Sequence, residues 1–441
     1  MSDKPVTLVV SDLHVGGGPS DPGDDHVCHD HQFVRFLSDQ AATPAGRHGE
    51  LELFVNGDFL EFAQTSPEAF HIASQDCWCT ELQSLDKLDT IVKGHPEIFA
   101  ALKAFQRNGN AVTLASGNHD VDLYWPGVQA RIRAEAGLGV RFEAGREWVD
   151  RHDGMLQIGH GHMEDVANRF SNWARPVVTS DFGVECLEMC PGTLFMVKFV
   201  NRLEATYPFA DNLLPVTRLA SVLLRDDTAG FAAVGWMFLM LVATMSKVKL
   251  STDGDDVSRR LLARFSGRRE GARLLAEVLG RNRLEQLAQR VRDDRLSAES
   301  MAEIMCELLG RIDMPQWLEL FGQSDGVLLG REGVTLSAIV RANFVDAKDD
   351  LCEAARRRAR ETHARVVVAG HTHQPDERAL DDGARYYNPG SWTRFLELER
   401  GQRVTLQDLR DESRYPYRLN YVRIERRGDE LASGMTCFEA G

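Results

Sequence analysis

Five short apolar runs in this chain each end at residues that can bind a metal ion. The segments that follow the runs are Ser11-Asp12-Leu13-His14, Gly57-Asp58, Gly117-Asn118-His119-Asp120, Gly159-His160-Gly161-His162 and Gly370-His371-Thr372-His373. In open α/β sheets the loops at the carboxyl ends of the strands lie at one edge and carry the ligand-binding residues. The pattern therefore predicts that five loops, distant in sequence, meet at one site.

The surrounding sequence favours the α/β class. Apolar runs at 6–10, 51–55, 111–115 and 155–158 predict buried strands. Between them, apolar residues recur at helical spacing over 26–37, 96–107 and 127–136. Strands that alternate with helices are typical of layered α/β domains.

The second half of the chain changes character twice. From 164 to 362 the strand pattern fades and helical patterns dominate, which predicts a helical insertion or cap. Strand patterns return at 364–369, and further short runs near 386, 395–398, 404–406 and 419–424 predict a terminal β-region. We therefore expect a core in two parts, 1–163 and 363–441, interrupted by the insertion 164–362.

The candidate ligands share one kind of chemistry. They offer oxygen and nitrogen donors without a thiolate, which suits Mn²⁺, Fe or Zn²⁺. The set comprises Asp12, His14, Asp58, Asn118, His160, His371 and His373. Seven ligands exceed the needs of one ion and fit two divalent ions that share a carboxylate, an arrangement used in phosphoryl displacement. His160 is preferred to His162 as the ligand because it ends its apolar run more directly.

The order of these segments resembles the calcineurin-like metallophosphoesterase family over residues 6–162 and 364–392. The stretch 56–62, Asn-Gly-Asp-Phe-Leu-Glu-Phe, is similar to the bacterial UDP-diacylglucosamine pyrophosphohydrolase subgroup. The resemblance implies a layered α/β/β/α sandwich, here with a large helical insertion. It also assigns the ligands: Asp12, His14 and His373 to the first metal, Asn118, His160 and His371 to the second, and Asp58 to both.

The same resemblance implies the catalytic groups. His119 corresponds to the family's catalytic histidine, and Glu61 to the acid that orients it. His162, Arg169 and Arg175 are candidates for substrate binding. For the two arginines, ordinary helix-surface charge is the alternative and is slightly favoured.

We therefore expect a hydrolase that cleaves a phosphate ester or phosphoanhydride with a hydroxide held between two metal ions. A phosphodiester or a lipid- or nucleotide-linked substrate is the leading expectation. One alternative is a phosphomonoesterase that acts on a phosphoprotein or a nucleotide. Another is a metal-bound scaffold whose cap recruits a partner protein, although the intact His119 counts against it.

Composition limits the partners and the location. The formal net charge of −15 argues against general nucleic-acid binding, which requires a basic surface. The eight cysteines form no CxxC pair, so we expect reduced thiols, and the first residues lack a signal-peptide pattern, so we expect a cytoplasmic enzyme. The uncharged run 229–245 is short for a membrane span; a buried helix is favoured over a peripheral membrane contact. The sequence leaves the oligomeric state open.

Overall fold

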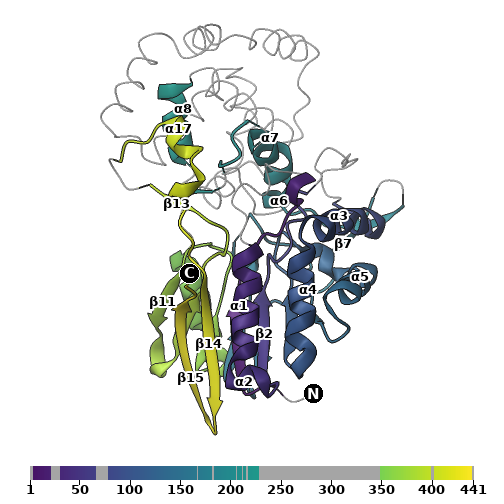
Figure 1. Ribbon diagram of the computed structural model, residues 1–441, viewed down its shortest axis with the longest axis vertical. Helices are drawn as coiled ribbons and strands as arrows, with labels where there is room; N and C mark the ends of the chain where they lie inside the picture. Colours follow the sequence, from purple (N-terminus) through teal and green to yellow (C-terminus); the bar gives the residue numbers. More distant parts are fainter. Residues whose placement is uncertain are drawn as a thin grey trace, which may run out of the picture. The chain divides into compact units, whose positions relative to one another are not determined.

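The computed structural model of the protein describes ten stretches of the chain (Figure 1). They are residues 3–20, 30–65, 78–165, 167–180, 183–204, 206–210, 212–214, 217–227, 348–398 and 402–439. Most of the predicted helical insertion and the whole apolar run 229–245 lie outside them. In these stretches, no helix has both the length and the apolar character needed to cross a membrane.

The chain forms two compact units. The first comprises residues 1–197, 346–394 and 416–441, and the second comprises 198–345 and 395–415. These bounds differ from the predicted 1–163, 164–362 and 363–441. α16 (Lys348–Thr362), which lies within the predicted insertion 164–362, packs its buried face, including Leu351 and Ala355, against Val367 and Tyr386 of the first unit.

The described part of the first unit is a mixed α/β structure with two main sheets. The strand order in the larger sheet is β15-β14-β1-β2-β3-β4. Its strands are β1 (Val6–Val10), β2 (Leu51–Asn56), β3 (Ala111–Ala115), β4 (Arg141–Glu143), β14 (Asn420–Arg427) and β15 (Glu430–Cys437). β1 to β4 run parallel, with Val6 opposite Leu51 and Glu52 opposite Ala111. β14 is antiparallel to both β1 and β15.

The second sheet carries the remaining predicted ligand loops. Its order is β11-β12-β10-β6-β5. The strands are β5 (Val149–Arg151), β6 (Leu156–Ile158), β10 (Val366–Val368), β11 (Asp376–Ala379) and β12 (Arg385–Asn388). β6, β10 and β12 are parallel, with Val366 opposite both Leu156 and Arg385. The carboxyl ends of β6 and β10 therefore lie at the same edge.

One apolar core joins the two sheets. Val9 and Phe54 of the first sheet share a buried cluster with Ile158, Val368 and Tyr387 of the second. Alternate side chains of a strand point to opposite faces, so this cluster fixes which face of each sheet is turned inward. It also fixes the register, because a slip of one residue would turn these apolar side chains away from the core.

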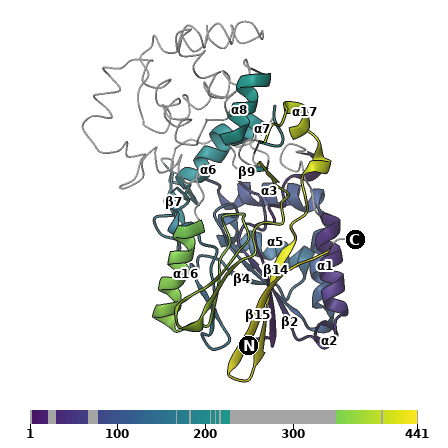
Figure 2. The same ribbon diagram turned by 90° about the vertical axis from the view of Figure 1, so that its left-hand side faces the viewer.

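Helices cover the outer faces of this unit. α16 packs on the second sheet, whereas Phe36 of α1 (Asp30–Ala42) contacts Tyr421 of β14 at a ring distance of 5.0 Å. Figure 2 shows α16 and α1 on opposite sides of the strands. The other helices of the unit are α2 (Pro44–Arg47), α3 (Glu81–Gly94), α4 (Pro96–Phe105), α5 (Pro126–Ala136) and α6 (Pro191–Phe195), and its short hairpin is β7 (Val177–Thr179) with β8 (Glu185–Leu187).

The described part of the second unit is small. β9 (Leu213–Leu214) pairs in parallel with β13 (Leu396–Glu397). α7 (Asn201–Glu204) precedes them, and α8 (Thr217–Asp226) is joined to α17 (Leu406–Leu409) by a hydrogen bond from the Leu406 amide to Asp226 Oδ2 at 3.0 Å. The prediction of a strand at 404–406 is wrong, because Thr405 and Asp408 form a capping box that starts α17.

The cysteines differ in part from expectation. Cys79, Cys190, Cys352 and Cys437 are free thiols. Cys186, in β8, is disulfide-bonded, so the expectation that all eight cysteines are reduced is wrong. The sequence pattern offered no CxxC pair from which this bond could be predicted.

Candidate metal centre

The loops after β1, β2, β3, β6 and β10 bring the predicted ligands together. Parallel strands end at one edge of each sheet, and the shared core aligns the two edges. Three overlapping groups have ligand atoms within 4.8 Å of one another. They are Asp12, His14, Asp58 and His373; His14, Glu61 and His119; and Asp58, His160 and His371. The first and third groups share Asp58.

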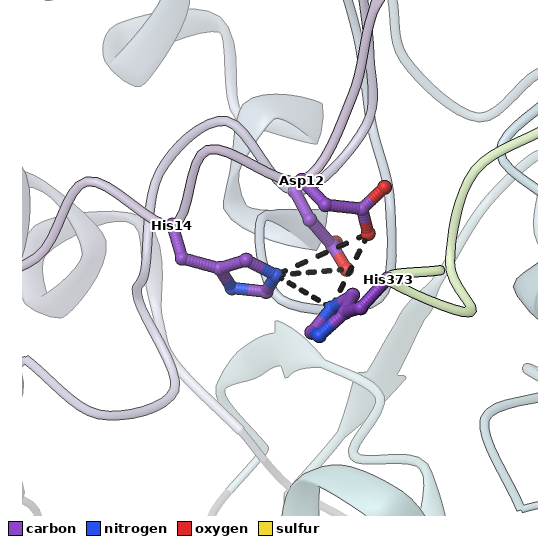
Figure 3. A group of neighbouring side chains, drawn as sticks. Asp12, His14 and His373 are labelled. Atoms are coloured by element: carbon purple, nitrogen blue, oxygen red, sulfur yellow. Dashed lines mark hydrogen bonds and ion pairs between the residues drawn. The ribbon is translucent and has the colours of Figure 1, made fainter. Parts of the chain in front are cut away.

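The first group surrounds one carboxylate. Figure 3 shows the imidazoles of His14 and His373 directed toward Asp12. His373 Nε2 lies 3.4 Å from Asp12 Oδ1, and His14 Nε2 lies 4.0 Å from the same oxygen. The two Nε2 atoms are 3.0 Å apart. Two ring nitrogens and a carboxylate oxygen thus converge, from loops more than 350 residues apart in sequence.

The third group is arranged around Asp58. His160 Nε2 lies 3.0 Å from Asp58 Oδ2, and His14 Nε2 of the first group lies 4.0 Å from that oxygen. The other nitrogen of His160, Nδ1, donates to the Asn56 carbonyl at 2.7 Å, which fixes the ring and its tautomer. Asp58 can therefore serve both groups at once.

Two buried oxygens test whether these residues suit a cation. Asn118 Oδ1 has no hydrogen-bond partner in the described part of the chain, and Asp12 Oδ1 faces ring nitrogens, the nearest being His373 Nε2 at 3.4 Å. The Asn118 amide nitrogen donates to Asn168 Oδ1 at 3.3 Å, which turns the amide oxygen the other way. A buried acceptor without a donor costs about 1–3 kcal/mol, and a bound cation would remove that cost. The donor set therefore fits a hard or borderline divalent ion.

The backbone at this site is strained. Eight non-glycine residues of the described chain have a positive φ, and five of them are predicted ligands. These five are Asp12 (55°), His14 (47°), Asp58 (49°), His371 (70°) and His373 (59°). Each such residue costs about 1–3 kcal/mol and persists only where the surrounding structure enforces it. Strain concentrated on the ligand residues indicates a functional site rather than ordinary surface loops.

The carboxylates and histidines of the site shift one another's pKa values. Burial alone would raise the pKa of Asp58, but the charges of His160 and His119 outweigh burial and hold its pKa well below the usual range. Burial also acts to lower the pKa of His160, and Asp58 and Asp12 instead raise it to about 9. The Asp58 carboxylate is therefore ionised at neutral pH, which favours cation binding.

Glu61 contacts two histidines. Its Oε2 lies 2.7 Å from His14 Nδ1 and 2.6 Å from His119 Nδ1. Burial would lower the pKa of His119, but the charges of Glu61 and Asp58 outweigh burial and raise it to about 10. The His119 amide also donates to Asp58 Oδ1 at 2.9 Å. His119 is thus held by the predicted orienting acid and by the shared carboxylate.

Asp120 is a site residue to which the sequence assigned no role. Its buried carboxylate accepts hydrogen bonds from the amides of Gly117 at 2.6 Å and Phe59 at 2.9 Å, joining the loops after β2 and β3. Burial and the charge of Asp58 raise its pKa to about 7. The residue directly follows His119, which is a signal that could have identified it.

Asp165 and Asn168 were also missed. Asp165 Oδ2 accepts from His371 Nε2 at 3.1 Å and from Asn168 Nδ2 at 2.6 Å. Burial would raise the pKa of Asp165, but the hydrogen bond and charge of His371 and the hydrogen bond from Asn168 together outweigh burial and lower the pKa. Their position after the His160 loop is the only sequence signal, because the contact with His371 spans 206 residues.

Glycines allow the loops to approach this closely. A Cβ on Gly117 would lie 2.1 Å from Asp58 Oδ1, and a Cβ on Gly370 would lie 2.1 Å from Ser11 Oγ and 2.9 Å from Asp12 Oδ2. Both positions therefore require glycine for packing against a ligand loop.

The three predicted substrate-binding residues lie in different surroundings. His162 is 2% exposed, with its ring 5.4 Å from that of His160 and 4.3 Å from that of Trp173. Burial holds its pKa well below the usual range, so the ring is neutral. Arg169 and Arg175 are exposed; Arg169 donates to the Met163 carbonyl, and Arg175 pairs with Glu185 at 3.1 Å.

No family model and no curated protein matches the chain. The assignment of a function therefore depends on the residues of the site.

Proposed function

We propose that the protein is a binuclear metal-dependent phosphoesterase with the layered α/β/β/α sandwich of the calcineurin-like metallophosphoesterases. The observation that carries the proposal is the position of Asp58, whose ligand atoms belong to two groups of potential metal ligands. A carboxylate common to both groups is what a two-metal centre requires.

The first ion would be held by Asp12, His14 and His373, the second by Asn118, His160 and His371, and both by Asp58. The Asn118 oxygen, which has no hydrogen-bond partner among the described residues, and the convergence of His14 and His373 on Asp12 support this assignment. When bound, two such ions supply Lewis acidity for the phosphoryl oxygens and lower the pKa of water toward neutrality.

His119 would act on the phosphate or its leaving group. Glu61 accepts a hydrogen bond from the Nδ1–H of His119, which leaves Nε2 as the nitrogen that can donate a proton to the substrate. Because Glu61 and Asp58 outweigh burial and raise the pKa of His119, the imidazole is protonated at neutral pH. A protonated imidazole can stabilise a phosphoryl oxygen and protonate a leaving oxygen.

The substrate class we propose is a phosphate ester or phosphoanhydride, with a diester or a lipid- or nucleotide-linked phosphate first. The metal centre is suited to several phosphate compounds, so selectivity must come from residues outside it. The test is an assay panel with Mn²⁺ that compares bis-aryl phosphate, mono-aryl phosphate and a nucleotide-sugar lipid.

The panel is run on wild type, Asp58→Ala, His119→Ala and the exposed control His48→Ala. We expect Asp58→Ala to abolish turnover, His119→Ala to lower it by about 10²–10⁴-fold, and the control to match wild type. If Asp58→Ala keeps full turnover, the binuclear proposal is wrong. If the metal-loaded wild type cleaves no phosphate ester, the assignment as a phosphoesterase is wrong.

A further inference from the structure

A line of hydrogen bonds connects two ligands of the proposed second metal. It runs from Asn118 Nδ2 to Asn168 Oδ1 at 3.3 Å, and from Asn168 Nδ2 to Asp165 Oδ2 at 2.6 Å. His371 Nε2 then lies 3.1 Å from the same Asp165 oxygen. Asn118 and His371 follow strands of different sheets, so this line joins the two sheets at the site.

The direction of every bond in the line is set by Asp165. An ionised carboxylate only accepts, so Asn168 must turn its NH₂ group toward Asp165 and its oxygen toward Asn118. That oxygen in turn requires the NH₂ group of Asn118. The amide oxygen of Asn118, which is the atom that binds hard cations, therefore faces away from the line, where it is buried and has no partner among the described residues.

The same carboxylate acts on His371. Because Asp165 accepts, His371 must carry its proton on Nε2, and Nδ1 is left as the nitrogen with a lone pair. A carboxylate that accepts from one ring nitrogen of a histidine fixes the tautomer and the ring orientation for metal binding through the other nitrogen.

The line has little freedom to rearrange. Asp165 Oδ1 accepts the Ala167 amide at 2.9 Å, so both carboxylate oxygens are engaged. Asn168 is 8% exposed and lies against Gly192, where a Cβ would come within 2.0 Å of Asn168 Oδ1. The Gly192 amide also bonds the Ala167 carbonyl at 2.7 Å. These contacts hold the loop after β6 in one arrangement.

We propose that Asp165, acting through Asn168, is a positioning residue that presents Asn118 Oδ1 and His371 Nδ1 to the second metal ion. The inference rests on the proposed metal centre but names residues outside its ligand set. It predicts that loss of the Asp165 carboxylate weakens the affinity for the second ion more than the affinity for the first ion.

The test is Mn²⁺ binding by equilibrium dialysis with metal analysis, applied to wild type, Asp165→Asn and Asn168→Ala. Asparagine keeps the shape of aspartate but has one acceptor oxygen, so it cannot receive both the Ala167 amide and the other two donors. Exposed Asp153→Asn is the matched control. We expect wild type and the control to bind two ions per chain. Asp165→Asn should keep the first affinity and weaken the second by about 10–100-fold, with a smaller loss for Asn168→Ala.

Electron paramagnetic resonance supplies a second readout that a general loss of stability would not produce. Wild type should give the spectrum of a coupled Mn²⁺ pair, and Asp165→Asn that of an isolated ion at the same metal concentration. Two unchanged affinities in Asp165→Asn or Asn168→Ala would overturn the inference. If Asp165→Asn does not fold, Asn168→Ala decides the matter. Wild type that binds fewer than two ions would instead refute the binuclear proposal itself.

Discussion

His14 and His119 share one carboxylate oxygen. Their Nδ1 atoms lie 2.7 and 2.6 Å from Glu61 Oε2, and the two rings meet edge to face at 4.7 Å. A proposed metal ligand and the proposed catalytic histidine are therefore oriented by the same group. A substitution that alters Glu61 Oε2 should therefore affect both metal binding through His14 and proton donation by His119.

Glu61→Gln tests this link. Glutamine removes the charge that, with Asp58, outweighs burial and raises the pKa of His119 to about 10. His119 should then lose its proton at a lower pH. The decline of phosphoesterase activity with rising pH should therefore begin at a lower pH in Glu61→Gln than in wild type. We also expect a loss of about 10–100-fold at neutral pH. The measurement is kcat/KM against pH with saturating Mn²⁺, beside exposed Glu97→Gln. Superimposable profiles for Glu61→Gln and wild type would exclude this role of Glu61.

Gly117→Ala tests the close approach of the loops after β2 and β3. The added methyl group would lie 2.1 Å from Asp58 Oδ1 and must displace the shared carboxylate. A misplacement of about 1 Å at a reacting centre costs about 100-fold in rate, and we expect a loss of at least that size. Gly434→Ala is the matched control, because a Cβ there meets nothing within 4 Å. Equal turnover in both variants would contradict the geometry described for Asp58.

Asp122 is not a proposed metal ligand, but its buried carboxyl group should make the stability of the fold depend on pH. It accepts hydrogen bonds from Ser84 Oγ and from Trp78 Nε1, the latter at 3.0 Å. Burial outweighs these bonds and raises its pKa from 3.8 to about 6. Folding therefore favours the neutral acid, and the contribution of Asp122 to stability is full below about pH 4 and lost as the pH rises through about 6.

Asp122→Asn should remove this dependence. Relative to the variant, wild type should lose about 3 kcal/mol of unfolding free energy between pH 4 and pH 7. Urea unfolding at several pH values measures the difference, with exposed Asp86→Asn as control. The interpretation fails if wild type and Asp122→Asn show parallel pH curves.

The sequence predicted the strands that carry the site better than the rest of the fold. β1 and β3 begin and end at the predicted residues, because each is a fully buried apolar run that ends at polar ligands. β15 was not predicted, because its residues are half-buried or exposed and lack an apolar run. α16 was expected within the insertion, because no local pattern in its sequence indicates which sheet it covers.

The sequence likewise predicted some features of the candidate site and not others. Residues within two positions of a strand end, such as Asp58 and His160, could be placed from their position, since parallel strands end at a common edge. Contacts made by Glu61 to His14 and by Asp165 to His371 depend on how separate loops pack, and no local pattern specifies them. Backbone strain at Asp12 and His371 is likewise visible only in three dimensions.

The most direct test of the central claim is a metal titration of metal-stripped protein, with hydrolysis of bis-aryl phosphate measured at each step. Because Asp58 joins two groups of ligands, activity should be absent without metal and should reach its plateau at two Mn²⁺ per chain. Asp58→Asn should remain inactive throughout the titration. Hydrolysis that proceeds without metal, or that reaches its plateau at one ion per chain, would contradict a binuclear phosphoesterase.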